Sequence, residues 1–260
     1  MNLAVLLCLT AGHILGDFLL QSDWEAGHKT KPSILLKHAG IHALLSYGLL
    51  GVWTAIWVPL VIGCSHCIID HAKAKSERRD SIRALLADQG AHGLVLLVLA
   101  WSAPFFVTEI SLFWTEMLGP AYLRALVLIA GFVLTVHAGG VLIKQAVQPF
   151  FEQLEAERER KGGQSARTQG LDKGGKIIGM LERSLVFLFL LIGQPSGLGF
   201  LVAAKSIFRI AELKDPEERM EAEYIILGTL MSFAYGIAAA YGTMCCLSLL
   251  QNLSQGGGAI

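Results

Sequence analysis

The sequence predicts an all-α membrane protein, a polytopic bundle of about eight transmembrane helices in two four-helix halves. Of the 260 residues, 53% are hydrophobic and only 16% are charged, whereas a soluble domain carries about 25% charged residues. Long apolar segments recur along the chain, and about 20 apolar residues are enough to cross a bilayer as a helix. The Lys and Arg residues gather in alternate connections, as the positive-inside rule describes for a multi-pass protein.

Eight segments are predicted to cross the membrane. The connections rich in Lys and Arg follow the first, third, fifth and seventh segments, so we expect both termini on the periplasmic or extracellular side of a bacterial inner membrane. A polar, Gly-rich stretch at 151–172 is expected to be a cytoplasmic linker between an N-terminal half at 1–150 and a C-terminal half at 173–260. The predicted spans are roughly 2–20, 34–50, 52–72, 83–103, 121–147, 173–193, 197–212 and 222–250.

Four of the predicted N-terminal spans each carry two metal-ligand side chains four residues apart. Residues at i and i+4 share one face of a helix, so each pair points two side chains in one direction. All four pairs also fall in the cytoplasmic third of their spans, and ionisable groups inside a membrane are usually functional. We therefore expect one polar pocket between helices. The pairs are His13 and Asp17, His38 and His42, His66 and Asp70, and Asp88 and His92.

The ligand types predict a divalent transition-metal site. Imidazole combined with carboxylate suits zinc, which we favour, and also manganese or iron, whereas magnesium and calcium sites are richer in oxygen. Eight groups exceed the four ligands of a tetrahedral zinc ion. The pocket therefore holds two ions, or one ion with the remaining groups orienting ligands or moving protons. The alternative is that the pairs are helix-end residues with ordinary hydrogen bonds.

Five further residues flank the expected pocket. Lys73 follows the third pair by three residues and either forms an ion pair with its aspartate or contacts a substrate anion. Gln21 and Gln89 are expected to orient the metal ligands. Gly12 and Gly16 flank the first histidine, and their small size lets another helix come close.

The C-terminal half carries a second group of polar residues, most of them at the same predicted depth. One interpretation is an internal salt-bridge network that holds the helices in register, because buried ions need partners. The other is that Arg183, Lys205 and Arg209 bind a phosphate or another anion, as guanidinium geometry favours. The residues expected to support this polar network are Glu182, Ser206, Glu223, Tyr224 and Thr229.

Several short motifs combine along the chain. In the N-terminal half they are His13-Ile-Leu-Gly-Asp17-Phe-Leu-Leu-Gln21, Lys37-His38-x-x-x-His42, His66-x-x-x-Asp70-x-x-Lys73 and Asp88-Gln89-x-x-His92. In the C-terminal half they are Gly179-x-Leu-Glu182-Arg183, Ala204-Lys205-Ser206-x-x-Arg209 and Glu223-Tyr224-x-x-x-Gly228-Thr229-x-x-Ser232. Together they resemble, over nearly the whole chain, a bacterial and phage membrane family known only as domain of unknown function 3307. This resemblance implies no reaction. A looser similarity, to bacterial membrane-bound metal-dependent hydrolases, rests on fold-level analogy.

Three functions are compatible with these residues. The first is a metal-dependent hydrolase that acts from the cytoplasmic side on a lipid-linked or phosphate-containing substrate. The second is a transporter or channel for divalent metal ions or protons, and the third is a non-catalytic sensor or effector with a structural metal ion. Membrane lipid is the expected partner, and the basic residues are split among short connections, which argues against nucleic acid. The candidate catalytic residues of the hydrolase are Asp17, Asp70, Lys73 and Asp88.

Overall fold

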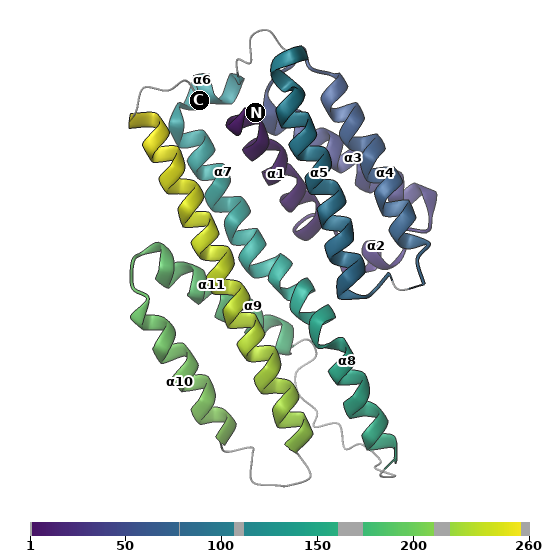
Figure 1. The fold of residues 1–260 in the computed structure, drawn as a ribbon, viewed down its shortest axis with the longest axis vertical. Helices are drawn as coiled ribbons and strands as arrows, with labels where there is room; N and C mark the ends of the chain where they lie inside the picture. Colours follow the sequence, from purple (N-terminus) through teal and green to yellow (C-terminus); the bar gives the residue numbers. More distant parts are fainter. Residues whose placement is uncertain (1, 78, 107–111, 161–173, 211–218, 256–260) are drawn as a thin grey trace. The chain divides into compact units, whose positions relative to one another are not determined.

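The computed structural model describes residues 2–77, 79–106, 112–160, 174–210 and 219–255, and every regular element in these ranges is a helix (Figure 1). The all-α prediction is therefore confirmed, and a helix lies at each of the eight segments predicted to span a membrane. The elements are α1 (Leu3–Phe18), α2 (Asp23–Gly27), α3 (Pro32–Leu50), α4 (Trp57–Ala74), α5 (Ile82–Phe106), α6 (Phe113–Leu118), α7 (Pro120–Val133), the π-helical segment η1 (Leu134–Ala138), α8 (Gly139–Arg160), α9 (Gly174–Leu191), α10 (Ser196–Ile210) and α11 (Arg219–Gln255).

The prediction of eight membrane-spanning helices in two four-helix halves is not supported. Within the described ranges, three helical stretches are long and apolar enough to cross a bilayer, namely Ile82–Pro104, Pro120–Glu157 and Ala222–Ser254. They are consistent with a membrane protein. Helices α1 and α10 are apolar but have only 16 and 15 residues. Helices α3, α4 and α9 carry ionisable side chains, which lower their hydropathy. The polar residues that predict a site thus lower the hydropathy by which a membrane-spanning helix is identified.

The chain divides into two compact units. The first contains Met1–Val133 and Thr243–Ile260, and the second contains Leu134–Gly242. In the first unit, α3 packs against α1 and α4, and α5 packs against the same two helices, so these four helices surround a common interior (Figure 1). Helix α7 packs on the outside of α1. Of the predicted linker, α8 includes the part up to Arg160, and 161–172 lies outside the described residues.

Local sequence signals set the ends of the helices that build this interior. Asn2 caps α1, where its Oδ1 accepts a hydrogen bond from a backbone N–H of the first turn at 3.1 Å. Pro32 begins α3, a position where its missing N–H is not needed, and Gly51 ends α3 with a φ of 64°. Ser22 and Glu25 form a capping box at the start of α2. These signals fix where α1, α2 and α3 begin or end and therefore which side chains face the interior.

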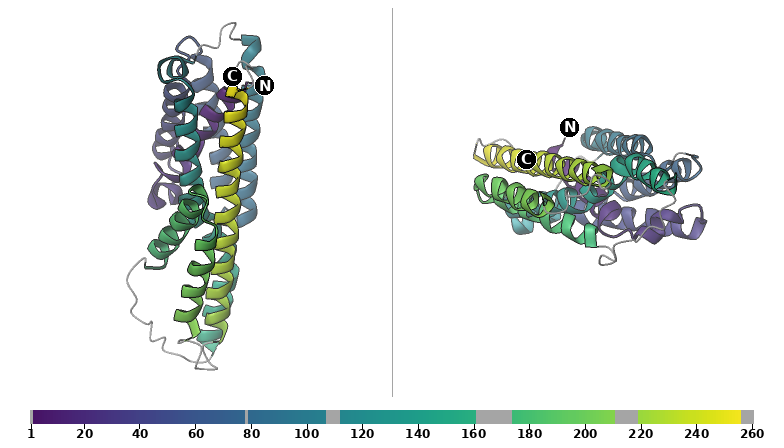
Figure 2. Two further views of the ribbon diagram at one scale, coloured as in Figure 1. Left: turned by 90° about the vertical axis from the view of Figure 1, so that its left-hand side faces the viewer. Right: turned by 90° about the horizontal axis from the view of Figure 1, so that it is seen from below.

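A buried arginine and the π-helical segment form the centre of the second unit. Helix α9 packs against η1, α8 and α10 (Figure 2). Gly193, with a φ of 70°, lies in the turn between α9 and α10. The guanidinium of Arg183 donates to the carbonyl oxygen of Val136 through Nε (3.1 Å) and Nη2 (2.8 Å), and to Ser232 Oγ through Nη1 (3.1 Å). Because a π-helical segment departs from regular α-helical hydrogen bonding, Arg183 supplies donors to a buried carbonyl within it.

Glycines make room for the Arg183 side chain. A Cβ on Gly139 would lie 3.0 Å from Arg183 Cδ and 2.7 Å from the ring of Tyr235, and a Cβ on Gly179 would lie 3.1 Å from Nη1 of the arginine. These distances are shorter than ordinary van der Waals contacts. A Cβ on Gly140 would likewise lie 3.1 Å from Nη2. The helices of the second unit therefore enclose the guanidinium because three positions beside it lack side chains.

The variant Arg183→Ala is expected to destabilise the second unit by about 2–4 kcal/mol, because a buried carbonyl loses its donors and a void remains. Thermal unfolding of the full chain in detergent measures this loss as a lower midpoint. Arg124→Ala removes an exposed arginine of α7 and should change the midpoint little. Equal midpoints for the two variants would contradict the structural role of Arg183.

Candidate metal centre

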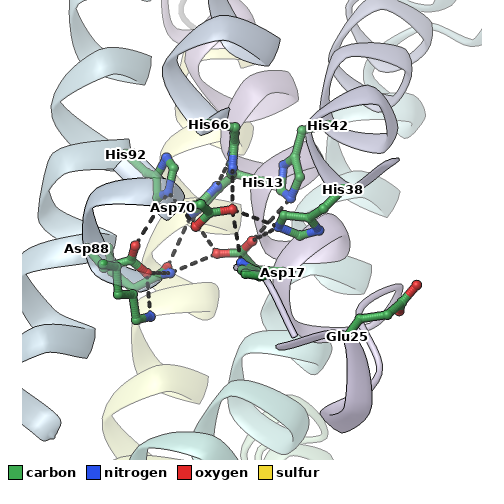
Figure 3. A network of polar contacts seen from close by, with 12 residues as sticks. His13, Asp17, Glu25, His38, His42, His66, Asp70, Asp88 and His92 are labelled. Atoms are coloured by element: carbon green, nitrogen blue, oxygen red, sulfur yellow. Dashed lines mark hydrogen bonds and ion pairs between the residues drawn. The ribbon is translucent and has the colours of Figure 1, made fainter. Parts of the chain in front are cut away.

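All eight side chains of the four predicted pairs meet in the interior of the first unit (Figure 3). Five are imidazoles and three are carboxylates, and in each of them 8% or less of the side-chain surface is exposed. Each of the four surrounding helices contributes one pair, as the spacing predicts. The contributions are His13 and Asp17 from α1, His38 and His42 from α3, His66 and Asp70 from α4, and Asp88 and His92 from α5.

The side chains form three overlapping groups, and within each group one ligand atom per residue lies within 4.8 Å of the others. Because His66 and His92 each belong to two groups, the three possible cation positions are neighbours. The Asp17 group consists of Asp17, His38, His42 and His66; the His13 group consists of His13, His66 and His92; and the Asp70 group consists of Asp70, Asp88 and His92.

Three imidazole rings are stacked in the middle of the cluster. The ring centroids of His42 and His66 are 3.6 Å apart, and those of His66 and His92 are 3.9 Å apart, with interplanar angles of 25° and 22°. His13 lies beside the stack, and its Nδ1 is 3.3 Å from Nε2 of His66. Two ligands bound at about 2.0–2.1 Å to one tetrahedral zinc ion lie roughly 3.3 Å apart. The two ring nitrogens are within hydrogen-bonding distance, and the same separation suits two ligands of one zinc ion.

Four buried ligand-type atoms of the cluster have no hydrogen-bond partner within the part of the chain that the structure describes. Leaving such an atom unpaired costs about 1–3 kcal/mol. Two of them, His92 Nε2 and Asp88 Oδ1, are 3.7 Å apart, and His92 Nε2 is also 3.7 Å from Asp70 Oδ1. A cation between these atoms would satisfy all three, so the residues fit a metal ion. The four atoms are His42 Nε2, His66 Nδ1, Asp88 Oδ1 and His92 Nε2. Of these, His42 Nε2 still lies within ion-pair distance of Asp17 Oδ1, at 3.1 Å.

The amide of Gln89 connects ligands from two helices. Its Nε2 donates to Asp17 Oδ2 at 2.8 Å and to Asp88 Oδ2 at 3.3 Å, and its Oε1 is 3.1 Å from Nε2 of His13. These contacts agree with the expectation that Gln89 orients ligands. Gln21 differs, because its buried Nε2 has no hydrogen-bond partner among the described residues.

Two lysines neutralise part of the negative charge of the cluster. Lys73 of α4 pairs with Asp88 of α5 (Nζ–Oδ2 2.8 Å), whereas one interpretation of the sequence paired it with Asp70. Lys29, in the turn after α2, pairs with Asp70 (Nζ–Oδ2 2.9 Å). Lys29 was not predicted to contact the cluster, because helical spacing does not reveal contacts made by a turn. With neutral imidazoles, three carboxylates and two ammonium groups leave one net negative charge, which favours a bound cation.

An ion pair outside the cluster connects the segment that carries Lys29 to α3. Glu25 of α2 pairs with Lys37 of α3 (Oε1–Nζ 2.6 Å), and Glu25 points away from the cluster in Figure 3. The hydrogen bond from Lys37, followed by those from Ser22, lowers the pKa of Glu25 to about 2. Because this pKa is lowered on folding, the stabilisation from these contacts is complete above the ordinary pKa of 4.5 and is lost as the pH falls towards 2.

The residues predicted to bind an anion in the C-terminal half make separate contacts. Arg183 donates to the backbone of η1 and to α11, and Lys205 pairs with Glu182 at 2.7 Å (Nζ–Oε2). The second contact agrees with the salt-bridge interpretation. The side chains of Ser206 and Arg209 lie outside the described residues, so an anion site formed by these basic residues stays a prediction.

The remaining members of the predicted polar network lie in α11. Thr229 Oγ1 donates to the backbone of its own helix at 2.8 Å. The ring of Tyr224 lies 5.9 Å from that of Phe151, measured between centroids. Glu223, one residue before Tyr224, is exposed. The contacts described for Thr229 and Tyr224 involve neither Arg183 nor Lys205.

Residues 5–118 match the model of a protein family described as "Protein of unknown function (DUF3307)". This part of the chain is similar to that family. The match includes all eight residues of the cluster together with Lys29, Lys73 and Gln89, but it does not extend to the C-terminal motifs. No curated protein and no solved structure matches the chain. Since the family description states no activity, the function has to be argued from the site.

The close approach of α1 and α3 beside the cluster depends on Gly16. A Cβ at this position would lie 2.3 Å from Cε1 and 2.5 Å from Nε2 of His42, so a larger residue has to displace the imidazole. A Cβ on Gly12, one turn earlier, would lie 3.6 Å from Leu49 Cδ1, which is an ordinary contact. The two glycines therefore form a matched pair for testing the cluster.

The variant Gly16→Ala is expected to weaken metal binding by about tenfold or more, because it moves the His42 ring away from its neighbours. Gly12→Ala should bind metal as the natural sequence does. Elemental analysis of the purified chain after equilibration with limiting zinc measures the difference, and circular dichroism verifies the helical fold. Equal metal contents in the two variants would show that the His42 ring is not required for binding.

Proposed function

We propose that this protein is a metal-dependent hydrolase of a bacterial inner membrane that acts from the cytoplasmic side on a lipid-linked or phosphate-containing substrate. The observation that carries the proposal is the pair of buried atoms His92 Nε2 and Asp88 Oδ1, which lack hydrogen bonds and lie 3.7 Å apart. Such atoms are costly unless a cation binds between them. Zinc is the favoured ion, since imidazole and carboxylate are its usual ligands, and manganese and iron suit the same set.

The Asp17 group and the Asp70 group supply ligands for one ion or two. When bound, such an ion acts as a Lewis acid that activates water or polarises an ester. The three aspartates are the candidates for the general base. Of these, Asp17 accepts a hydrogen bond from Gln89, which holds its carboxylate in a fixed orientation. Lys73, next to Asp88, is suited to neutralise charge that develops on the substrate.

A location near one membrane surface supports a lipid-linked substrate. Three helical stretches are long and apolar enough to cross a bilayer. Of the two lysines of the cluster, Lys29 lies in, and Lys73 lies in the helical turn directly before, a basic connection that the positive-inside rule assigns to the cytoplasm. The proposed centre therefore lies close to the headgroups of the cytoplasmic leaflet, with both chain termini on the opposite side of the membrane.

Transport of divalent metal ions is the second candidate function. The observation that favours it is the sharing of His66 and His92 between ligand groups, because neighbouring sites with common ligands allow an ion to pass from one to the next. Metal uptake into proteoliposomes without hydrolysis of any substrate would favour this function over the hydrolase.

The full chain purified in detergent is expected to contain at least one tightly bound transition-metal ion, measured by elemental analysis. In mixed micelles with phosphatidic acid it is expected to release phosphate. His42→Ala should lose the metal and reduce the rate of release by at least about 100-fold, because a buried ligand is removed. His71→Ala removes an exposed histidine next to Asp70 in the sequence and should retain both properties.

Two outcomes would contradict the hydrolase. One is a correctly folded natural chain that contains no transition metal and takes up none from solution. The other is a metal-loaded chain that hydrolyses neither phosphatidic acid nor a panel of chromogenic phosphate and carboxylate esters.

A further inference from the structure

Two lysines lie at the border between the buried carboxylates and the surroundings of the cluster. The side chain of Lys29 is 11% exposed and that of Lys73 is 23% exposed, whereas their partners Asp70 and Asp88 are 1% and 4% exposed. The lysines come from separate elements, the turn after α2 and the last turn of α4. The two ammonium groups therefore reach the Asp70 group from two separate elements of the chain.

Each of the two carboxylates has one oxygen next to a lysine and the other next to His92. In Asp70, Oδ2 contacts Lys29 and Oδ1 lies 3.7 Å from His92 Nε2. In Asp88, Oδ2 contacts Lys73 and Oδ1 lies 3.7 Å from the same nitrogen. A cation held by His92 and the two Oδ1 atoms would thus share both carboxylates with the two ammonium groups.

The charges of this arrangement predict which kind of ligand binds after the metal ion. Without a metal ion, the three carboxylates and two ammonium groups of the cluster carry one net negative charge. A divalent ion in the Asp70 group changes this net charge to plus one, and it competes with Lys29 and Lys73 for the carboxylates of Asp70 and Asp88. The metal-loaded cluster therefore attracts an anion. A phosphate group offsets the positive charge and accepts hydrogen bonds from two ammonium groups.

We propose that Lys29 and Lys73 form a phosphate-binding subsite beside the Asp70 group, and that a divalent metal ion and a phosphate group bind there cooperatively. The inference rests on the metal centre of the proposed function and names the group that its substrate presents. The phosphate belongs either to a lipid headgroup or to a soluble molecule. Because coupling between two ligands is reciprocal, the metal raises the affinity for phosphate by the same factor as phosphate raises the affinity for the metal.

Isothermal titration calorimetry with inorganic phosphate tests the coupling directly. The full chain in detergent is either loaded with zinc and desalted, or stripped with a chelator, and the metal content of each sample is measured. We expect phosphate to bind the loaded chain at least about tenfold more tightly than the stripped chain. Nanodiscs that contain phosphatidic acid or only phosphatidylcholine form the second arm. If nanodiscs with phosphatidic acid compete with inorganic phosphate and nanodiscs with only phosphatidylcholine do not, the phosphate belongs to a lipid headgroup. If neither kind of nanodisc competes, the phosphate belongs to a soluble molecule.

Variants of the lysines test the subsite. Lys29→Gln and Lys73→Gln should each retain the metal and weaken phosphate binding by about tenfold, while Lys73→Arg, which keeps a cation, should recover part of the affinity. Lys75→Gln is the matched control, because Lys75 is an exposed lysine two residues after Lys73 that has no part in the cluster. It should bind phosphate as the natural chain does.

The outcomes separate this inference from the proposed function. A chain that binds metal but takes up phosphate equally well with and without it overturns the coupling and leaves the metal centre intact. Unchanged phosphate affinity in both glutamine variants overturns the subsite. A natural chain that binds no metal removes the proposed function and this inference together. Cooperative binding without hydrolysis would support the subsite and argue against the hydrolase.

Discussion

Ionisable side chains can share one helical interior only if each has a partner, and this requirement determines the structure of the first unit. Three carboxylates, five imidazoles and two lysines meet between α1, α3, α4 and α5. Hydrogen bonds and ion pairs satisfy part of the set, but four buried atoms still lack a hydrogen bond in the described part of the chain. The helices also have to come close enough for imidazoles to stack, which Gly16 allows. The candidate metal centre therefore depends on the close packing of the helices as well as on the ligand residues.

In the second unit, the partners of the buried charge are all protein atoms. Its buried arginine is surrounded by backbone and a serine hydroxyl, and it donates twice to one carbonyl oxygen of the π-helical segment. Glycines on neighbouring turns replace side chains that would collide with the guanidinium. A single fixed cation thus holds three helical elements together there. In the second unit, the buried guanidinium has hydrogen-bond partners and stabilises the packing. In the first unit, buried ligand atoms without hydrogen bonds favour the binding of a cation.

The candidate site was largely predictable because helical spacing is a local property. The four pairs at i and i+4 have to point the same way on their own helices, and each helix contributes its pair to the cluster. The number of membrane spans was not predictable in this way, since the histidines of α3 and α4 lower the hydropathy that identifies a span. Lys29 was missed because it contacts a residue 41 positions away, and a turn carries no periodic signal. The π-helical segment that accepts from Arg183 has no sequence pattern that distinguishes it from an ordinary helix.

Segments that connect helices usually tolerate insertions, because they contact little of the interior. The segment between α1 and α3 is an exception. It is tied on its outer side by Glu25 and Lys37, and on its inner side Lys29 ends 2.9 Å from an almost fully buried carboxylate. One added residue would move the ammonium group away from Asp70 and leave that carboxylate without its nearest counter-charge. The length of this short connection is therefore constrained by an ion pair, although most of its residues lie on the surface.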